Sequence, residues 1–208
     1  MFSLQTIFGK GDKFYGLLEQ SAEQACLSAQ LLRKMVMRES GFEADELTFP
    51  HLREKAIATE ISEALVNTFV TALDREDIEE LSSALYRIPK TIQKFAERYQ
   101  LVAERLGDID FGPRAELLVS ATGEVAEMVG ELRHGLHITC IRRLQDRLQA
   151  IESEADRLLL EPYSTLYVDG EDPVRVLLAK DLFELIEKAI DRCRDAGNVI
   201  YGIVLKNS

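Results

Sequence analysis

Residues 107–113, Gly-Asp-Ile-Asp-Phe-Gly-Pro, interrupt a chain that otherwise follows a helical pattern. On both sides of this segment apolar residues recur every three or four positions, as on the core-facing side of an amphipathic helix. The segment holds two glycines, two aspartates and a proline that suits the first turn of a following helix. It lies near the middle of the 208 residues. It therefore predicts a linker between two helical halves, residues 1–107 and 108–208.

Capping and helix-breaking residues divide each half into three helices. Ser40 and Gly41 end the first helix, because glycine readily adopts the left-handed conformation that closes a helix. Pro50 and Pro173 suit the first turns of later helices. Short connections force neighbouring helices to run antiparallel, so we expect an all-α fold of six helices in two antiparallel three-helix bundles. The expected helices cover about 12–38, 48–72, 74–106, 113–134, 137–161 and 173–205.

Composition excludes several classes of function. Thirty-six acidic and 25 basic residues give a formal charge of −11, which would repel a nucleic-acid backbone over most of the surface. No apolar run approaches the roughly 20 residues that span a bilayer, so no direct membrane insertion is expected. Cys26, Cys140 and Cys193 are widely spaced and odd in number, which favours a reducing compartment over a disulfide framework. We expect a cytoplasmic protein.

Five carboxylates in the second half repeat a four-residue spacing. Glu152 and Asp156 lie on the fifth expected helix, and Glu187, Asp191 and Asp195 lie on the sixth. Residues four apart are neighbours on one helical face. If the two faces adjoin, the clustered charges require protons, arginines or a cation. Oxygen ligands suit iron, manganese, magnesium or calcium, and zinc also accepts them.

A solvated helix surface is the alternative explanation of these acids. In a chain this acidic, pairs of acids four residues apart arise by chance, so the spacing alone is weak evidence. A helical wheel also places Glu187, Asp191 and Asp195 away from the apolar stripe of the sixth helix. The sequence pattern by itself therefore leaves both the metal site and the solvated face open.

Three segments resemble the PhoU-like family of phosphate-transport regulators, in the branch of Pit accessory proteins. These are Phe69-Val-Thr-Ala-Leu-Asp-Arg-Glu-Asp-Ile78, Glu152-Ser-Glu-Ala-Asp156 and residues 185–206. The resemblance implies two three-helix bundles with E/DxxxD motifs on two helices of each. In that family these motifs can hold multinuclear iron or zinc clusters on the outer surface. It also implies that Glu152, Asp156, Glu187, Asp191 and Asp195 are the metal ligands of the second half.

The first half departs from the motifs of the family. Its second helix has His51 and Lys55 at the ligand positions, and its third helix has Tyr86, Lys90 and Lys94. These residues supply positive charge where a metal ion would require negative charge. We therefore expect the first-half metal site to be absent or replaced by an anion site.

The resemblance implies a regulator of inorganic phosphate transport and not an enzyme. We expect it to contact a Pit-type phosphate permease, to form homo-oligomers, and to reach the inner face of the membrane through its partner. Two alternatives remain at this point. One is a metal-free helical adaptor, and the other is a carboxylate-bridged metalloenzyme, which would need an enclosed pocket at the second-half acids.

Overall fold

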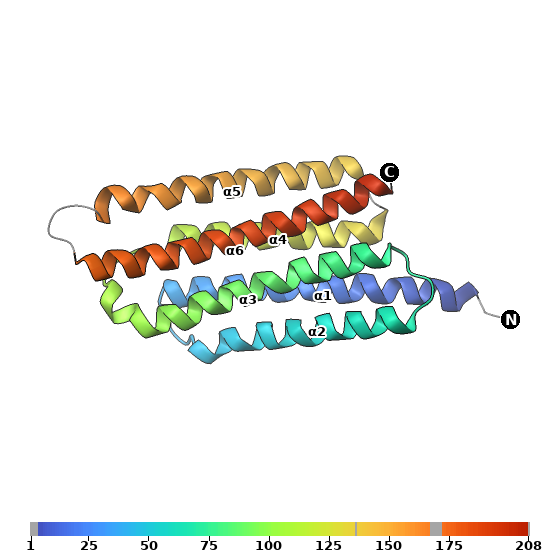
Figure 1. Cartoon of the computed structure of the whole chain (residues 1–208), viewed down its shortest axis with the longest axis horizontal. Coiled ribbons are helices and arrows are strands. Elements are labelled where there is room, and N and C mark those ends of the chain that lie inside the picture. Colours follow the sequence, from blue (N-terminus) through green and yellow to red (C-terminus); the bar gives the residue numbers. More distant parts are fainter. Residues whose placement is uncertain (1–3, 136, 167–171, 208) are drawn as a thin grey trace.

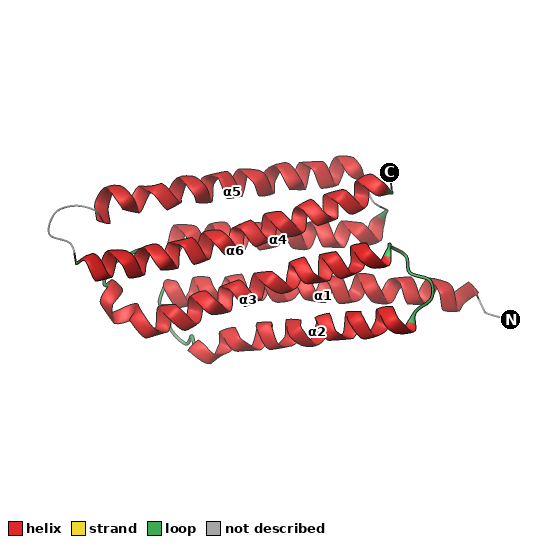
Figure 2. Cartoon of the chain, viewed as in Figure 1, coloured by secondary structure: helices red, strands yellow, loops and turns green. Residues whose placement is uncertain are grey.

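The computed structural model describes residues 4–135, 137–166 and 172–207, with side chains at 13–43, 46–135, 137–158 and 172–207. These residues form six α-helices and no strand, which confirms the all-α prediction (Figures 1 and 2). A short 3₁₀ segment, η1 (Ala44–Leu47), precedes the second helix. The helices are α1 (Leu4–Val36), α2 (Thr48–Asn67), α3 (Arg75–Leu106), α4 (Gly112–His134), α5 (Ile138–Leu166) and α6 (Pro173–Lys206).

Most helix ends lie where glycine, proline or a capping residue predicts them. Gly107 and Gly135 follow α3 and α4 with positive φ angles of 64° and 119°. At the start of α6, the Asp172 side chain accepts a hydrogen bond from the backbone N–H of Val174, and Pro173 occupies the first turn. These local signals therefore determine the ends of three helices.

Three predicted boundaries were wrong. The first helix begins at Leu4, eight residues before the predicted start, and the fifth continues through Pro162 to Leu166. The second ends at Asn67 and not near Ala72, because the Arg75 guanidinium donates hydrogen bonds to the carbonyl oxygens of Leu65 and Thr68. A side chain from the next helix thus satisfies carbonyl groups that would otherwise lack partners.

The helices pack in a layered arrangement with four at the centre. Helices α1, α3, α4 and α6 are central, α2 covers α1 and α3 on one side, and α5 covers α4 and α6 on the other (Figure 1). Within each half the three helices contact one another, and consecutive helices run antiparallel. The halves also pack together closely, α1 against α4 and α3 against α6.

One hydrophobic core spans both halves. It includes Leu18 and Ile88 from the first half and Val125 and Ile190 from the second, all at most 1% exposed. Phe111, in the predicted linker, is buried against it. The division at residues 107 and 108 stays a prediction about chain organisation, since the two groups of helices share their apolar interior.

Candidate metal centre on helices α5 and α6

The structure brings together acids from two helices that the sequence places 31 or more residues apart. Helices α5 and α6 pack against each other along their length. Glu152 and Asp156 of α5 face Glu187 and Asp191 of α6, and all of them except the exposed Asp156 are partly buried. We call these four residues the acidic cluster. Carboxylates of the fifth and sixth helices therefore do adjoin, for four of the five residues expected to converge.

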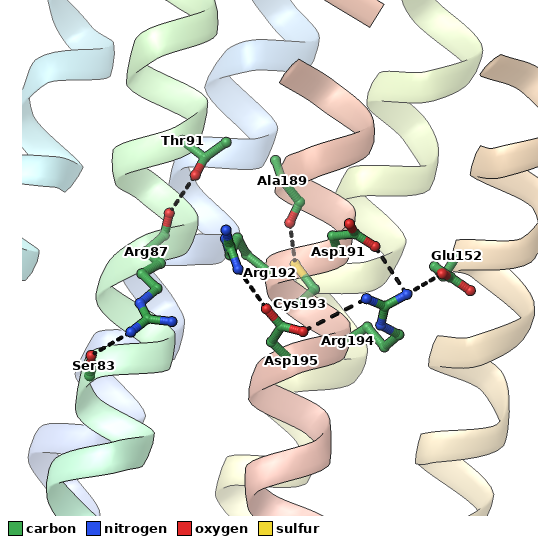
Figure 3. Close-up of polar contacts among 10 residues, drawn as sticks. All are labelled: Ser83, Arg87, Thr91, Glu152, Ala189, Asp191, Arg192, Cys193, Arg194 and Asp195. Carbon is green, nitrogen blue, oxygen red and sulfur yellow. Dashed lines mark hydrogen bonds and ion pairs between the residues drawn. The ribbon is translucent and has the colours of Figure 1, made fainter. Parts of the chain in front are cut away.

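An arginine lies among these carboxylates. The Arg194 guanidinium forms ion pairs with Glu152 and, at 3.1 Å from Nη1 to Oδ1, with Asp191 (Figure 3). Its Nη2 lies 3.8 Å from Oδ1 of Asp195. One positive charge is thus shared among several carboxylates, which it offsets in part, and it also links α5 to α6.

The pKa of Glu187 is raised by its surroundings. Burial raises its pKa, and the nearby carboxylates of Asp191 and Asp156 raise it further, to about 7. A hydrogen bond with Asp191 acts in the same direction, while Arg194 opposes the shift. Near neutral pH the acidic cluster is therefore compensated by an arginine and by partial protonation, two of the three ways in which clustered carboxylates can coexist.

Asp195 lies at the edge of this arrangement. Each four-residue step along a helix turns about 40° around the axis, so Asp195 is rotated by about 80° from Glu187. Its carboxylate pairs with Arg192, 2.7 Å from Nη1 to Oδ2, and lines an open cavity of about 610 Å³ between α3 and α6. The other lining residues are Glu76, Glu79, Glu80, Ser83, Ala84, Arg87, Asn198 and Val199.

In this arrangement the acids do not fit a metal ion. Carboxylate oxygens suit a hard divalent cation, but the guanidinium of Arg194 lies among them. In the described part of the chain, no three His, Cys, Asp or Glu side chains are placed so that they could hold a metal ion together. The assignment of Glu152, Asp156, Glu187, Asp191 and Asp195 as ligands therefore stays a prediction.

Arg194 is the residue that the sequence analysis missed. It follows Asp191 by three positions and precedes Asp195 directly. An arginine within one helical turn of two acids is a signal for ion pairing on the same face. The alternation of acids and arginines in residues 191–195 could thus have indicated internal compensation.

The corresponding positions of the first half carry basic and aromatic side chains in place of the acids. The His51 ring of α2 lies 5.6 Å from the Tyr86 ring of α3, and Nζ of Lys90 lies 5.3 Å from the same Tyr86 ring. Burial lowers the pKa of His51, and the nearby ammonium groups of Lys90 and Lys55 lower it further. Four of the five residues at these positions, His51, Lys55, Tyr86 and Lys90, therefore lie close together.

Among the described residues, no helix combines the length and apolar character that a bilayer-crossing segment requires.

The sequence matches no family model, but it is similar to two curated proteins. The "putative pit accessory protein" of Rhizobium meliloti (strain 1021) is 22% identical over 205 residues, which cover 94% of each chain. The UPF0111 protein YkaA of Bacillus subtilis (strain 168) is 23% identical over 150 residues, covering 69% of this chain and 70% of that protein.

Two solved structures from Shewanella oneidensis MR-1 have the same fold. A PhoU-like protein superposes with a TM-score of 0.80 at 15% identity, covering 92% of this chain and 96% of that one. A "putative PhoU-like phosphate regulatory protein" superposes with a TM-score of 0.78 at 17% identity, covering 93% and 99%. The chain therefore has the PhoU-like all-α fold, and the resemblance inferred from its sequence motifs is confirmed.

Proposed function

We propose that the protein regulates inorganic phosphate transport as an accessory of a membrane phosphate permease of the Pit type. The observation that carries this proposal is the end-to-end match to a protein named as a pit accessory protein, over 94% of both chains. The PhoU-like fold, shared with a protein named as a phosphate regulatory protein, supports the same class of function. The accessory acts at the cytoplasmic face of the membrane.

Regulation by contact, and not catalysis, is the mode of action that we propose. The relatives with informative names are described as accessory or regulatory proteins. Cys193 is fully buried, and burial raises the pKa of its thiol, so it is unsuited to nucleophilic attack. Three members of the acidic cluster are partly buried between two helices, and Arg194 offsets part of its charge. This compensation favours a regulator that is stable without a metal ion.

The connection between α2 and α3 is our candidate for the permease contact. Val66, Phe69 and Val70 are 82%, 101% and 62% exposed, and grouped apolar side chains on a surface often mark interaction sites. Exposed acids, including Glu63 and Asp74, lie beside them in the sequence. Cytoplasmic loops of membrane proteins are rich in lysine and arginine, so an apolar tip flanked by acids is complementary to such a partner.

Copurification from membranes tests both the function and the contact. A tagged chain should recover a phosphate permease, and the double variant Phe69→Ser with Val70→Ser should recover much less of it. Leu101→Ser is the matched control, since Leu101 is 84% exposed on α3. Recovery of no transporter would contradict the function, whereas equal recovery by all three proteins would contradict only the contact site. Light scattering on the same proteins measures the homo-oligomerisation that we also propose.

A further inference from the structure

Helices α2 and α3 carry a group of cations that lack acidic partners. Lys55, Lys90 and Lys94 are exposed, and none of them forms an ion pair with another described residue. Lys90 and Lys94 are one helical turn apart on α3, and Lys55 lies one turn after His51 on α2. Lys34 and Lys188 also form no ion pair among the described residues, so what sets Lys55, Lys90 and Lys94 apart is their place on two adjacent helices beside His51 and Tyr86.

The His51 side chain lies near two members of this group, Lys55 and Lys90. Its ring packs at 5.6 Å from Tyr86, and Lys90 and Lys55 are both close enough to lower its pKa. Its Nδ1 atom is buried and has no hydrogen-bond partner among the described residues. Buried polar atoms are rarely left without partners, so this nitrogen points to a group that the protein alone does not supply.

Glu97 is an acidic side chain near His51 and supplies negative charge beside the lysines. Its carboxylate raises the pKa of His51, whereas Lys90 and Lys55 lower it. The same carboxylate accepts a hydrogen bond from Nε2 of Gln93 at 2.8 Å. One carboxylate cannot offset three ammonium groups. The local charge therefore stays positive, whereas the acids at the equivalent place on α5 and α6 are offset by Arg194.

We propose that His51, Lys55, Lys90 and Lys94, which we call the basic cluster, bind a phosphate group. Lysine ammonium groups recognise phosphate as point charges, and a dianion would relieve the repulsion among them. The Nδ1 atom of His51 is closed to solvent, so it would hydrogen-bond a phosphate oxygen only after the side chain turns outward. Free inorganic phosphate and a phospholipid headgroup share this chemistry. The inference does not rest on the proposed function, since the purified protein alone suffices to test it.

Titration with inorganic phosphate is the direct test, against chloride at equal ionic strength. The double variant Lys55→Gln with Lys90→Gln should bind phosphate about tenfold more weakly than the wild type, given the strength of exposed charge pairs. The control is Lys34→Gln with Lys188→Gln, which removes two exposed lysines from α1 and α6. It should bind as the wild type does. Phosphate should also raise the pKa of His51, measured by NMR.

Vesicles distinguish the two sources of the phosphate group. Phosphatidylcholine vesicles with and without phosphatidate are compared in a flotation assay. Binding that needs phosphatidate and is lost in Lys55→Gln with Lys90→Gln, without binding of free phosphate, assigns the site to a lipid headgroup. Absence of both kinds of binding, or equal binding by wild type and variant, would overturn the proposal. If the double variant fails to fold, Lys94→Gln alone provides the same comparison.

Discussion

Glu54 is a carboxyl group buried inside the first half. It is 0% exposed on α2, and the Ser21 hydroxyl of α1 donates a hydrogen bond of 2.5 Å to its Oε1. Its Oε2 is buried and has no hydrogen-bond partner among the described residues. Burial raises the pKa of Glu54 to about 7, although the hydrogen bond from Ser21 opposes the shift. The protonated form is therefore favoured in the folded protein.

This raised pKa gives a stability prediction with a definite sign. Between the ordinary pKa of about 4.5 and the folded value of about 7, the unfolded chain binds fewer protons than the folded one. Stability due to Glu54 is thus present below about pH 4.5 and is lost as the pH rises to 7. Glu54→Gln should leave stability near pH 5 almost unchanged and should increase it by about 1–3 kcal/mol at pH 8.

Urea unfolding at pH 5 and pH 8 measures this effect. Glu63→Gln on the exposed side of the same helix is the control, and it should change stability little at either pH. A Glu54→Gln protein that is less stable than the wild type at pH 8 would show that the charged carboxylate is stabilised in a way that these contacts do not explain.

Metal binding at the acidic cluster depends on Arg194. In the present arrangement the guanidinium compensates the carboxylates that a cation would need. Arg194→Gln should therefore bind iron, manganese or zinc more tightly than the wild type, because it leaves the acids without an internal cation. Asp156→Ala with Asp191→Ala removes one predicted ligand from each helix and should bind least.

Calorimetric titration of the three proteins with each metal gives the order of affinities. Identical curves for all three would contradict the predicted ligands and favour the metal-free adaptor. If a change at His51 abolished binding instead, the metal site would lie in the first half, which would contradict the prediction.

At the scale of helices, α5 and α6 approach closely at Gly197. A Cβ atom at this position would lie 2.6 Å from Cδ2 of Leu148 and 2.7 Å from Oε1 of Gln145. Both neighbours are buried, and Gln145 donates a hydrogen bond to Asn198 at 2.6 Å. Because Gly197 has no side chain, α6 can approach α5 closely here. This contact therefore sets the distance between the two helices that carry the acidic cluster.

Gly197→Ala should destabilise the protein by about 1–3 kcal/mol, because the extra methyl group overpacks this contact. Gly123→Ala in α4 is the matched control. Gly123 is exposed and a Cβ there would meet no atom within 4 Å, so alanine should stabilise by up to about 1 kcal/mol. Thermal unfolding of both variants measures the difference. A neutral or stabilising Gly197→Ala would show that α5 and α6 separate easily.

Element types could be predicted from the sequence because apolar periodicity reports directly on helix formation. Ends marked by Gly107, Gly135 and Pro173 were also predictable, since the signal is local. The end of α2 was not, because it depends on Arg75 reaching back from the next helix. The same limit applied at the site. Spacing predicted that acids share a face, but the place of Arg194 among them depends on how α5 packs against α6.

At the scale of the whole molecule, two groups of three helices share one core and differ in the side chains at corresponding surface positions. Helices α5 and α6 present compensated acids, α2 and α3 present uncompensated cations, and the α2–α3 connection exposes apolar side chains. These features lie on different parts of one helical body. The arrangement suits a protein that acts through its surfaces, in agreement with an accessory role.

Membrane recovery in the presence and absence of the permease tests the proposed role most directly. If the protein acts as an accessory of the permease, its attachment to the membrane should depend on that partner. We predict that the tagged protein sediments with membranes from cells that contain the phosphate permease and stays in the supernatant when the permease gene is deleted. Equal recovery with membranes from both kinds of cells would contradict the account.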